Sequence, residues 1–424
     1  MTDLQFTNLL IVCVVGFAAP FALGLVPALR LPAVVLELIV GIVIGPSGLD
    51  WVHVDEPVAV LALIGLAYLL FLSGLEIEFD KLRGTLLRTA LLSFVVSIVV
   101  GVGVGLVLKA TNQVASPLFV AIVLSGTSLG VVVPVLKDSG VIASPFGQLL
   151  IAAASIADVA TIILLSLFFS RDGSGIGATL VLLGLLALLA LAISATVLFS
   201  AHSRRIGDVL SRLQDTTAQI RLRAAFMLLI GFAAAAQALG LEVILGTFIA
   251  GALLSVLDHD KVMSHPLFRT KLEAAGFGIF IPVFFVTSGV RFDLDALTSS
   301  ASTAARVPLF LAGLLIVRGV PALLLYRRAA GSAQRARIAA LLQSTSLPFI
   351  IAATAVGTDL GIISGGTAAA MIAAGLLSVL LFPLTALTLL QRDGAGASPA
   401  PASMPDPMVP RPMGDLVLSG AADE

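Results

Sequence analysis

The stretch Leu36-Glu37-Leu38-Ile39-Val40-Gly41-Ile42-Val43-Ile44-Gly45 resembles a later one, Leu241-Glu242-Val243-Ile244-Leu245-Gly246-Thr247-Phe248-Ile249-Ala250-Gly251. Two more pairs of segments follow in the same order, and they are Phe71–Gly74 with Phe285–Gly289 and Ser125–Leu129 with Ser344–Leu347. Apolar helices share a small alphabet, so one match could arise by chance. Three matches in one order indicate an internal repeat.

The composition places this repeat in a membrane. Of the 424 residues, 58% are hydrophobic and 12% are charged, and the mean hydropathy is +1.11. Such values are typical of chains with spans of about 20 apolar residues. The lipid bilayer is therefore an expected partner, whereas the net charge of −1 does not indicate nucleic acid. The single cysteine, Cys13, excludes a disulfide framework. No Lys or Arg precedes Arg30, so we expect the first apolar segment to be retained.

The apolar segments predict about thirteen transmembrane helices. They run over roughly 7–29, 32–49, 57–75, 86–108, 115–136, 145–169, 175–200, 222–239, 241–257, 272–290, 303–326, 336–357 and 361–390. With the N-terminus outside, all but six of the 24 Lys and Arg residues fall in inner loops, as the positive-inside rule requires. The other six are Lys109, Arg171, Arg291 and Arg306 in outer loops, Arg318 within a span and Arg411 near the chain end. We expect a multi-pass protein of the plasma membrane with a cytoplasmic C-terminus.

The repeat is inverted. Its paired segments lie in spans 2 and 9, 3 and 10, and 5 and 12, and an odd shift of seven spans reverses the direction of each second copy. Inverted repeats are typical of secondary transporters, with the binding site near the bilayer midplane. We expect an all-α polytopic membrane protein whose transmembrane domain covers residues 1–392. Its repeats run over roughly 7–170 and 222–390, joined by a linker helix over 175–200.

The remaining residues are not expected to add a folded domain. Residues 393–424 are rich in Gly, Ala, Ser, Pro and Met, which predicts a disordered cytoplasmic tail. We expect no nucleotide-binding regulatory domain. The stretch Gly101-Val102-Gly103-Val104-Gly105 resembles part of a dinucleotide fingerprint, but it lies inside a predicted span, where small residues serve helix packing.

Spans 5 and 12 are predicted to be broken. Each combines hydroxyl side chains with a helix breaker in mid-membrane: Ser125–Ser128 with Pro134, and Thr345 and Ser346 with Pro348. Helices that unwind there would expose backbone groups that must line a polar cavity, and two of them would cross near a common site. Alternatively, the hydroxyls bond back to their own helices and the prolines only kink them.

Asp158 is the candidate for the central functional residue. It lies in the apolar run Ile151–Leu165, and a carboxylate at that depth costs at least about 2.5–3.5 kcal/mol on insertion scales. Other acids are near span ends. Glu76 and Glu78 end the third span and are interpreted as loop residues or part of an entry funnel. Glu37 and Glu242 are expected to be structural, because they begin helices.

Taken together, these motifs resemble the monovalent cation:proton antiporter superfamily over about residues 10–390. The segments that carry the resemblance are Leu31–Pro46, Leu69–Glu76, Thr127-Ser128 with Asp158, Leu245–Gly251 and Pro282–Gly289. The resemblance implies a homodimer with a dimerisation part and a moving, ion-translocating part.

The resemblance also implies roles for single residues. Asp158 would be protonated and bound to Na⁺ or K⁺ in alternation, with Thr127 and Ser128 beside it. Arg318 falls where the family has a basic residue; it would either neutralise half-helix C-termini or pair with Asp158, or less readily take part in titration itself. The family usually has Asp, Asn or Gln before the key acid, but this chain has Ala157. Ser155 is a candidate substitute as an ion ligand.

The residues and the resemblance together predict a secondary active antiporter that exchanges H⁺ for Na⁺ or K⁺, with one acid and therefore no net charge moved. No other cofactor is expected. A cation channel and an organic-anion symporter of related architecture are the alternatives. An enzyme is not expected, because an aspartyl protease needs two deep acids and the four histidines fall in loops.

Overall fold

The computed structural model describes residues 6–25, 32–77, 84–169, 176–201, 219–259, 268–327 and 331–392, and their regular elements are all helical. The first part of the chain forms α1 Thr7–Leu25, α2 Ala33–Ile44, α3 Glu56–Leu75, α4 Gly84–Ala110, α5 Pro117–Leu124, α6 Leu129–Asp138, α7 Pro145–Phe168 and α8 Ile176–Ala201. The second part forms α10 Ile220–Ala238, α11 Val243–His259, α12 Phe268–Ala275, η1 Gly276–Phe280, α13 Ile281–Val290, α14 Leu294–Thr298, α15 Ala301–Leu314, η2 Leu315–Gly319, α16 Val320–Leu325, α18 Ala333–Gln343, α19 Pro348–Asp359 and α20 Gly365–Arg392.

The all-α polytopic fold is confirmed, but the count of thirteen spans is not. Eleven segments of the described chain are long and apolar enough to cross a membrane. The predicted spans 32–49 and 241–257 correspond to the shorter apolar helices Ala33–Ile44 and Val243–Leu257. At 1.5 Å per residue, the 12 residues of α2 cover about 18 Å, less than the roughly 30 Å of a hydrocarbon core. Pro32 and Gly45 bound this helix. The predicted tail, residues 393–424, lies outside the described residues.

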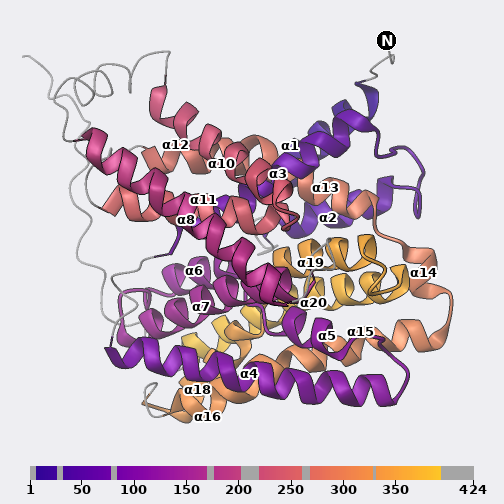
Figure 1. Ribbon diagram of the computed structural model, residues 1–424. Helices are drawn as coiled ribbons and strands as arrows, with labels where there is room; N and C mark the ends of the chain where they lie inside the picture. Colours follow the sequence, from indigo (N-terminus) through magenta and orange to yellow (C-terminus); the bar gives the residue numbers. More distant parts are fainter. Residues whose placement is uncertain are drawn as a thin grey trace, which may run out of the picture.

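The helices form two layers (Figure 1). In the upper layer, α3 packs on α11, α2 on α13, and α10 on α11. In the lower layer, α4 packs on α5 and α7, while α20 packs on α15, α18 and α19. Helix α8 contacts α11 and α7, so it touches both layers. Each layer therefore combines helices from both predicted repeats, as an inverted repeat requires.

The repeated glycines explain the packing of the upper layer. Helix α11 carries the second copy of the α2 motif, and α13 carries the second copy of the α3 motif, so the contacts α2–α13 and α3–α11 are counterparts. A Cβ on a motif glycine would lie about 2 Å from a backbone oxygen of the facing helix: Gly41 2.2 Å from Val286, Gly289 2.2 Å from Leu38, Gly74 2.2 Å from Phe248 and Gly251 1.9 Å from Phe71. Only glycine permits this approach, which is the usual role of small residues between membrane helices.

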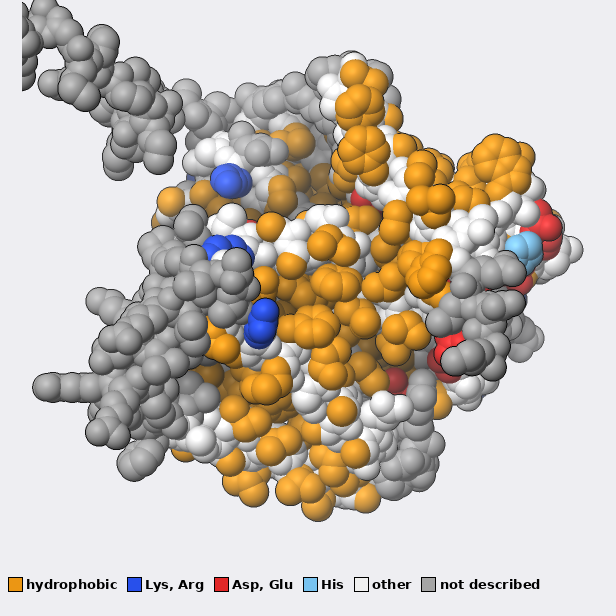
Figure 2. All heavy atoms as spheres, turned by 90° about the horizontal axis from the view of Figure 1, so that it is seen from above, with side chains coloured by type: hydrophobic (Ala, Val, Ile, Leu, Met, Phe, Trp, Pro, Cys, Tyr) orange, Lys and Arg blue, Asp and Glu red, His pale blue; other side chains and the backbone are white. Residues whose placement is uncertain are grey.

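The surface separates apolar from charged side chains. Seen from above, the upper layer presents mainly hydrophobic side chains, with Lys and Arg toward one end and Asp, Glu and His toward the other (Figure 2). Large apolar residues such as Phe17 and Val99 are more than half exposed. An apolar surface of this kind suits a hydrocarbon environment.

Candidate functional site

The site is built around two broken helices. Helix α5 ends at Leu124 and α6 begins at Leu129; likewise, α18 ends at Gln343 and α19 begins at Pro348. The two copies end in the same way. Ser125 Oγ donates to Ala121 O at 2.7 Å, and Ser344 Oγ donates to Ala340 O at 2.7 Å, so each hydroxyl caps a carbonyl of its own half-helix. The segments between the half-helices are almost fully buried.

The two unwound segments cross and are hydrogen-bonded to each other. Ser128 N donates to Thr345 O at 2.8 Å, and Thr127 Oγ1 donates to Gln343 O at 2.6 Å. These bonds partner backbone groups that the broken helices leave free, which is the condition for non-helical backbone at membrane depth. The predicted crossing is confirmed.

Helix α7 carries Asp158 to this crossing. The helix begins with Pro145 after an N-cap, Ser144, whose hydroxyl accepts from Gly147 N at 3.0 Å. Asp158 follows 13 residues after Pro145, roughly 20 Å along the axis. The backbone amide of Leu129, the first residue of α6, faces the Asp158 carboxylate. The positive end of a half-helix dipole thus faces the acid.

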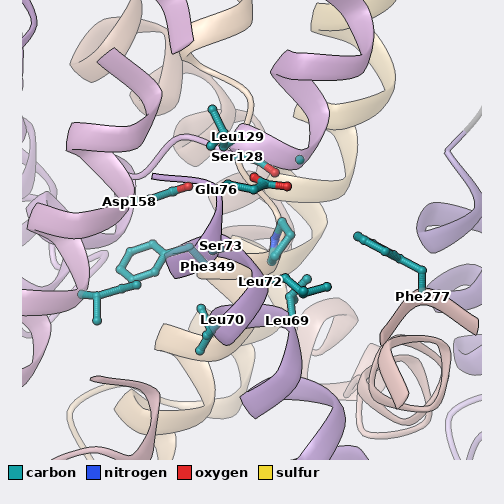
Figure 3. Close-up of a pocket in the computed structure, with 13 residues that line it drawn as sticks. Leu69, Leu70, Leu72, Ser73, Glu76, Ser128, Leu129, Asp158, Phe277 and Phe349 are labelled. Carbon is teal, nitrogen blue, oxygen red and sulfur yellow. The ribbon is translucent and has the colours of Figure 1, made fainter. Parts of the chain in front are cut away.

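Asp158 lines a small cavity of about 50 Å³. Its other polar lining side chains are Ser73, Glu76 and Ser128, and the remaining walls are mainly apolar. In Figure 3 the Asp158 carboxylate is directed toward Glu76 across the cavity, with the start of α6 above and the Phe349 ring below. The volume is sufficient for a few water molecules or a small ion, since one water needs about 10–15 Å³.

Glu76 brings a second carboxylate to the cavity. It is the C-cap residue of α3, and its charge acts electrostatically on Asp158. The sequence predicts a loop or funnel position for Glu76, because it follows the last apolar residue of its span. Its partner in that interpretation, Glu78, lies outside the described residues. In the described part of the chain, no three His, Cys, Asp or Glu side chains are grouped as a metal site. The side-chain oxygens that line this cavity belong to two carboxylates and two hydroxyls.

The structure places the other predicted site residues around the crossing. Ser128 lines the cavity, and Pro348 lines it from the start of α19. Ser155 is buried one turn before Asp158 but does not line the cavity, and Ala157 is fully buried among apolar side chains. Thr345 contributes its carbonyl to the crossing. The amide of Ser346 donates to Ser378 Oγ at 3.1 Å, which holds the second unwound segment against α20.

Arg318 lies behind the crossing, in the π-helical segment η2, and is 1% exposed. Within the described part of the chain its acceptors are neutral oxygens: Thr127 Oγ1 at 2.8 Å, Ser97 Oγ at 3.3 Å, Ala153 O at 3.4 Å and Gln343 Oε1 at 2.5 Å. The Thr127 hydroxyl is therefore engaged by Arg318 and by the carbonyl of Gln343, and Thr127 does not line the cavity.

A second, larger cavity of about 630 Å³ lies at the opposite end of α3, where residues of this helix from Ala59 to Leu66 line it. It is the repeat counterpart of the first. Ser73 corresponds to the Thr287-Ser288 pair in the paired motifs, and Glu76, two residues after Gly74, corresponds to Arg291, two residues after Gly289. The two cavities therefore lie at opposite ends of the bundle, are related by the inverted repeat and differ more than tenfold in volume.

Comparisons with known proteins agree with this architecture. Residues 11–392 match the family model described as the transmembrane sodium/hydrogen exchanger. YjbQ of Bacillus subtilis is 31% identical over 93% of this chain, and its name of Na⁺/H⁺ antiporter is provisional. The present chain spans 64% of the length of YjbQ. GerN of Bacillus cereus, named a Na⁺/H⁺-K⁺ antiporter, is 29% identical over 63% of this chain and 67% of its own. The solved structure of the sodium proton antiporter MjNhaP1 from Methanocaldococcus jannaschii has the same fold, with a TM-score of 0.65 at 16% identity over 91% of this chain and 98% of that one.

Proposed function

The chain belongs to the sodium/hydrogen exchanger family, and we propose that it is a secondary active antiporter that exchanges protons for Na⁺ or K⁺ through Asp158. One observation carries the proposal: the deep carboxylate lies in a cavity where two broken helices of an inverted repeat cross. Relatives named for Na⁺/H⁺ and Na⁺/H⁺-K⁺ antiport support the choice of ions.

Competition at one carboxylate couples the two fluxes. The Asp158 oxygens bind either a proton or an alkali cation, so a site that releases one ion on one side of the membrane returns with the other. Oxygen ligands suit hard cations, and Glu76, Ser73 and Ser128 offer further oxygens in the same cavity. The amide at the start of α6 stabilises the charged carboxylate after the proton has left.

The paired cavities support alternating access. In this conformation the cavity at the Ala59 end of α3 is wide, and the cavity that contains Asp158 is narrow. The inverted repeat relates the two ends of the bundle to each other. In the opposite conformation, the cavity at the Ala59 end would therefore be narrow and the Asp158 cavity wide. A channel would need both ends open at once, which the structure does not favour.

Orientation and assembly are further parts of the proposal. The separation of basic from acidic side chains along the bundle (Figure 2) supports a cytoplasmic C-terminus and an outside N-terminus. The plasma membrane and the homodimer expected from the resemblance stay predictions. Labelling of single cysteines from each side of sealed vesicles would test the orientation, and the protein mass in detergent would test the dimer.

We expect one-for-one exchange in vesicles. A gradient of Na⁺, K⁺ or Li⁺ across vesicles that contain the purified protein should drive an opposite proton flux, measured with a pH-sensitive dye. If Asp158 alone exchanges its proton for the cation, the initial rate should not change when a membrane potential is imposed. A rate that follows the potential would contradict electroneutral exchange. Cation uptake with no proton movement would favour an organic-anion symporter, and a current without coupling would indicate a channel.

Replacing Glu76 with Gln should weaken cation binding and leave transport partly active. The change removes one of the two negative charges of the cavity and keeps the shape of the side chain. The cation concentration for half-maximal exchange should rise about fivefold, the order expected when one charge is lost near a partly screened site. The matched control is Glu56→Gln, an exposed acid at the other end of α3. Equal half-saturation in both variants would remove Glu76 from the site.

A further inference from the structure

Gln343 joins three elements of the site. It is the last residue of half-helix α18 and is fully buried. Its backbone carbonyl accepts from Thr127 Oγ1 at 2.6 Å, so it belongs to the crossing. Its side-chain amide donates to Leu150 O of α7 at 2.9 Å, two turns before Asp158. Its side-chain carbonyl accepts from Arg318 Nη2 at 2.5 Å. One residue thus connects both broken helices, the helix of the acid and the buried cation.

The bond to Gln343 matters because Arg318 has no acidic partner at hydrogen-bonding distance among the described residues. A buried guanidinium that bonds only to neutral oxygens keeps its full charge, and it is attracted toward any carboxylate within reach. The charges of Arg318 and Asp158 act on each other. The titratable groups whose charges act on Arg318 are Asp158 and Tyr326, and those that act on Asp158 are Glu76 and Arg318. A hydrogen-bond partner must therefore keep the Arg318 guanidinium away from the Asp158 carboxylate.

We propose that Gln343 is a positioning residue that holds Arg318 behind the crossing, so that its guanidinium does not occupy the Asp158 carboxylate in place of the transported cation. The other three bonds leave Arg318 less constrained, since two of them are long, at 3.3 and 3.4 Å. The acceptor of the short bond is itself held in place, because the side-chain amide of Gln343 also donates to Leu150 O of α7. This role rests on the proposed function of Asp158 as the cation site.

Two substitutions should move cation affinity in opposite directions. Gln343→Met removes both side-chain bonds but keeps the volume; Arg318 is then free to approach Asp158, and Na⁺ should bind about fivefold more weakly. Gln343→Glu has the same shape and adds a negative charge that pairs with Arg318; the positive field at Asp158 falls, and Na⁺ should bind about fivefold more tightly. A residue that is only structural would weaken binding in both variants.

The measurement is Na⁺ binding to the purified full-length protein by titration calorimetry at an alkaline pH, where protons do not compete. The controls are Gln148→Met and Gln148→Glu, because Gln148 lies on the same helix as Asp158 and donates to Ile142 O at 2.8 Å without contact to Arg318. Unchanged affinity in both Gln343 variants, or the same direction of change, would overturn the role. If Gln343→Glu does not fold, the double variant Gln343→Met with Arg318→Met decides: removing the guanidinium should reverse the weaker Na⁺ binding of Gln343→Met, and binding that stays weak would overturn the role.

Binding and transport are measured separately, so the two proposals can fail separately. Shifted Na⁺ binding in the Gln343 variants, combined with no exchange by wild-type protein in vesicles, would reject the antiport function and retain the role of Gln343. Normal wild-type exchange, combined with unchanged binding in the variants, would reject Gln343 alone.

Discussion

Asp158→Asn is expected to reduce cation-driven proton flux in reconstituted vesicles to the level of empty vesicles. Asparagine keeps the shape of the side chain and an oxygen that faces the Leu129 amide at the start of α6. It cannot bind and release a proton, and it lacks the charge that attracts an alkali cation. Both halves of the exchange depend on this one group, and no partial activity is expected.

The control for this loss is Asp295→Asn, which makes the same chemical change at an exposed residue of α14. It should exchange at the wild-type rate. The unfolding temperature of Asp158→Asn in detergent should not fall below that of wild type, because the change removes a buried charge that is costly to desolvate. Wild-type exchange by Asp158→Asn would show that the proton and the cation use another route.

Gly251→Ala should severely destabilise the fold. A Cβ at this position would lie 1.9 Å from Phe71 O and 3.0 Å from Leu75 N, both backbone atoms of α3 that cannot rotate away. Helices α3 and α11 would have to separate along their contact. Overpacking costs typically about 1–3 kcal/mol, and more where the backbone must move, so we expect a large fall in unfolding temperature and little folded protein after purification.

The matched control is Gly103→Ala in α4, where a Cβ would meet no atom within 4 Å. This change should leave the unfolding temperature unchanged or raise it slightly, because alanine is the better helix former. Equal stability of the two alanine variants would mean that α3 and α11 are not held as closely as the structure indicates. The comparison separates the effect of close packing from the general effect of losing a glycine.

Much of the architecture could be predicted from local patterns. The broken helices could be predicted because hydroxyl side chains lie near a proline in two spans, at Ser125–Ser128 with Pro134 and at Thr345 and Ser346 with Pro348. Serine and threonine side chains compete with the backbone hydrogen bonds of a helix. The depth of Asp158 followed from the length of the apolar run around it. The family resemblance, drawn from the same motifs, is confirmed by the match over residues 11–392.

The composition of the site was less predictable. Glu76 follows the last residue of its helix, and only the tertiary arrangement, in which the end of α3 and the start of α6 line one cavity, places it with Asp158. Gln343 directly precedes the hydroxyl motif, and a single polar residue at the end of an apolar helix carries no pattern that predicts its partners. Thr127 was expected to bind the ion, but the structure directs its hydroxyl to Arg318 and to the carbonyl of Gln343. Whether Ser155 contributes to ion binding stays a prediction.

The sequence by itself determined that this chain crosses a membrane in an inverted repeat, with one deep carboxylate and two interrupted helices. Those properties depend on hydrophobicity, charge and neighbouring residues, which act along the chain. Only the tertiary structure decided which side chains share the Asp158 cavity and which atoms hold Arg318. Those properties depend on contacts between residues far apart in the chain, where a side chain's direction is set by helix packing.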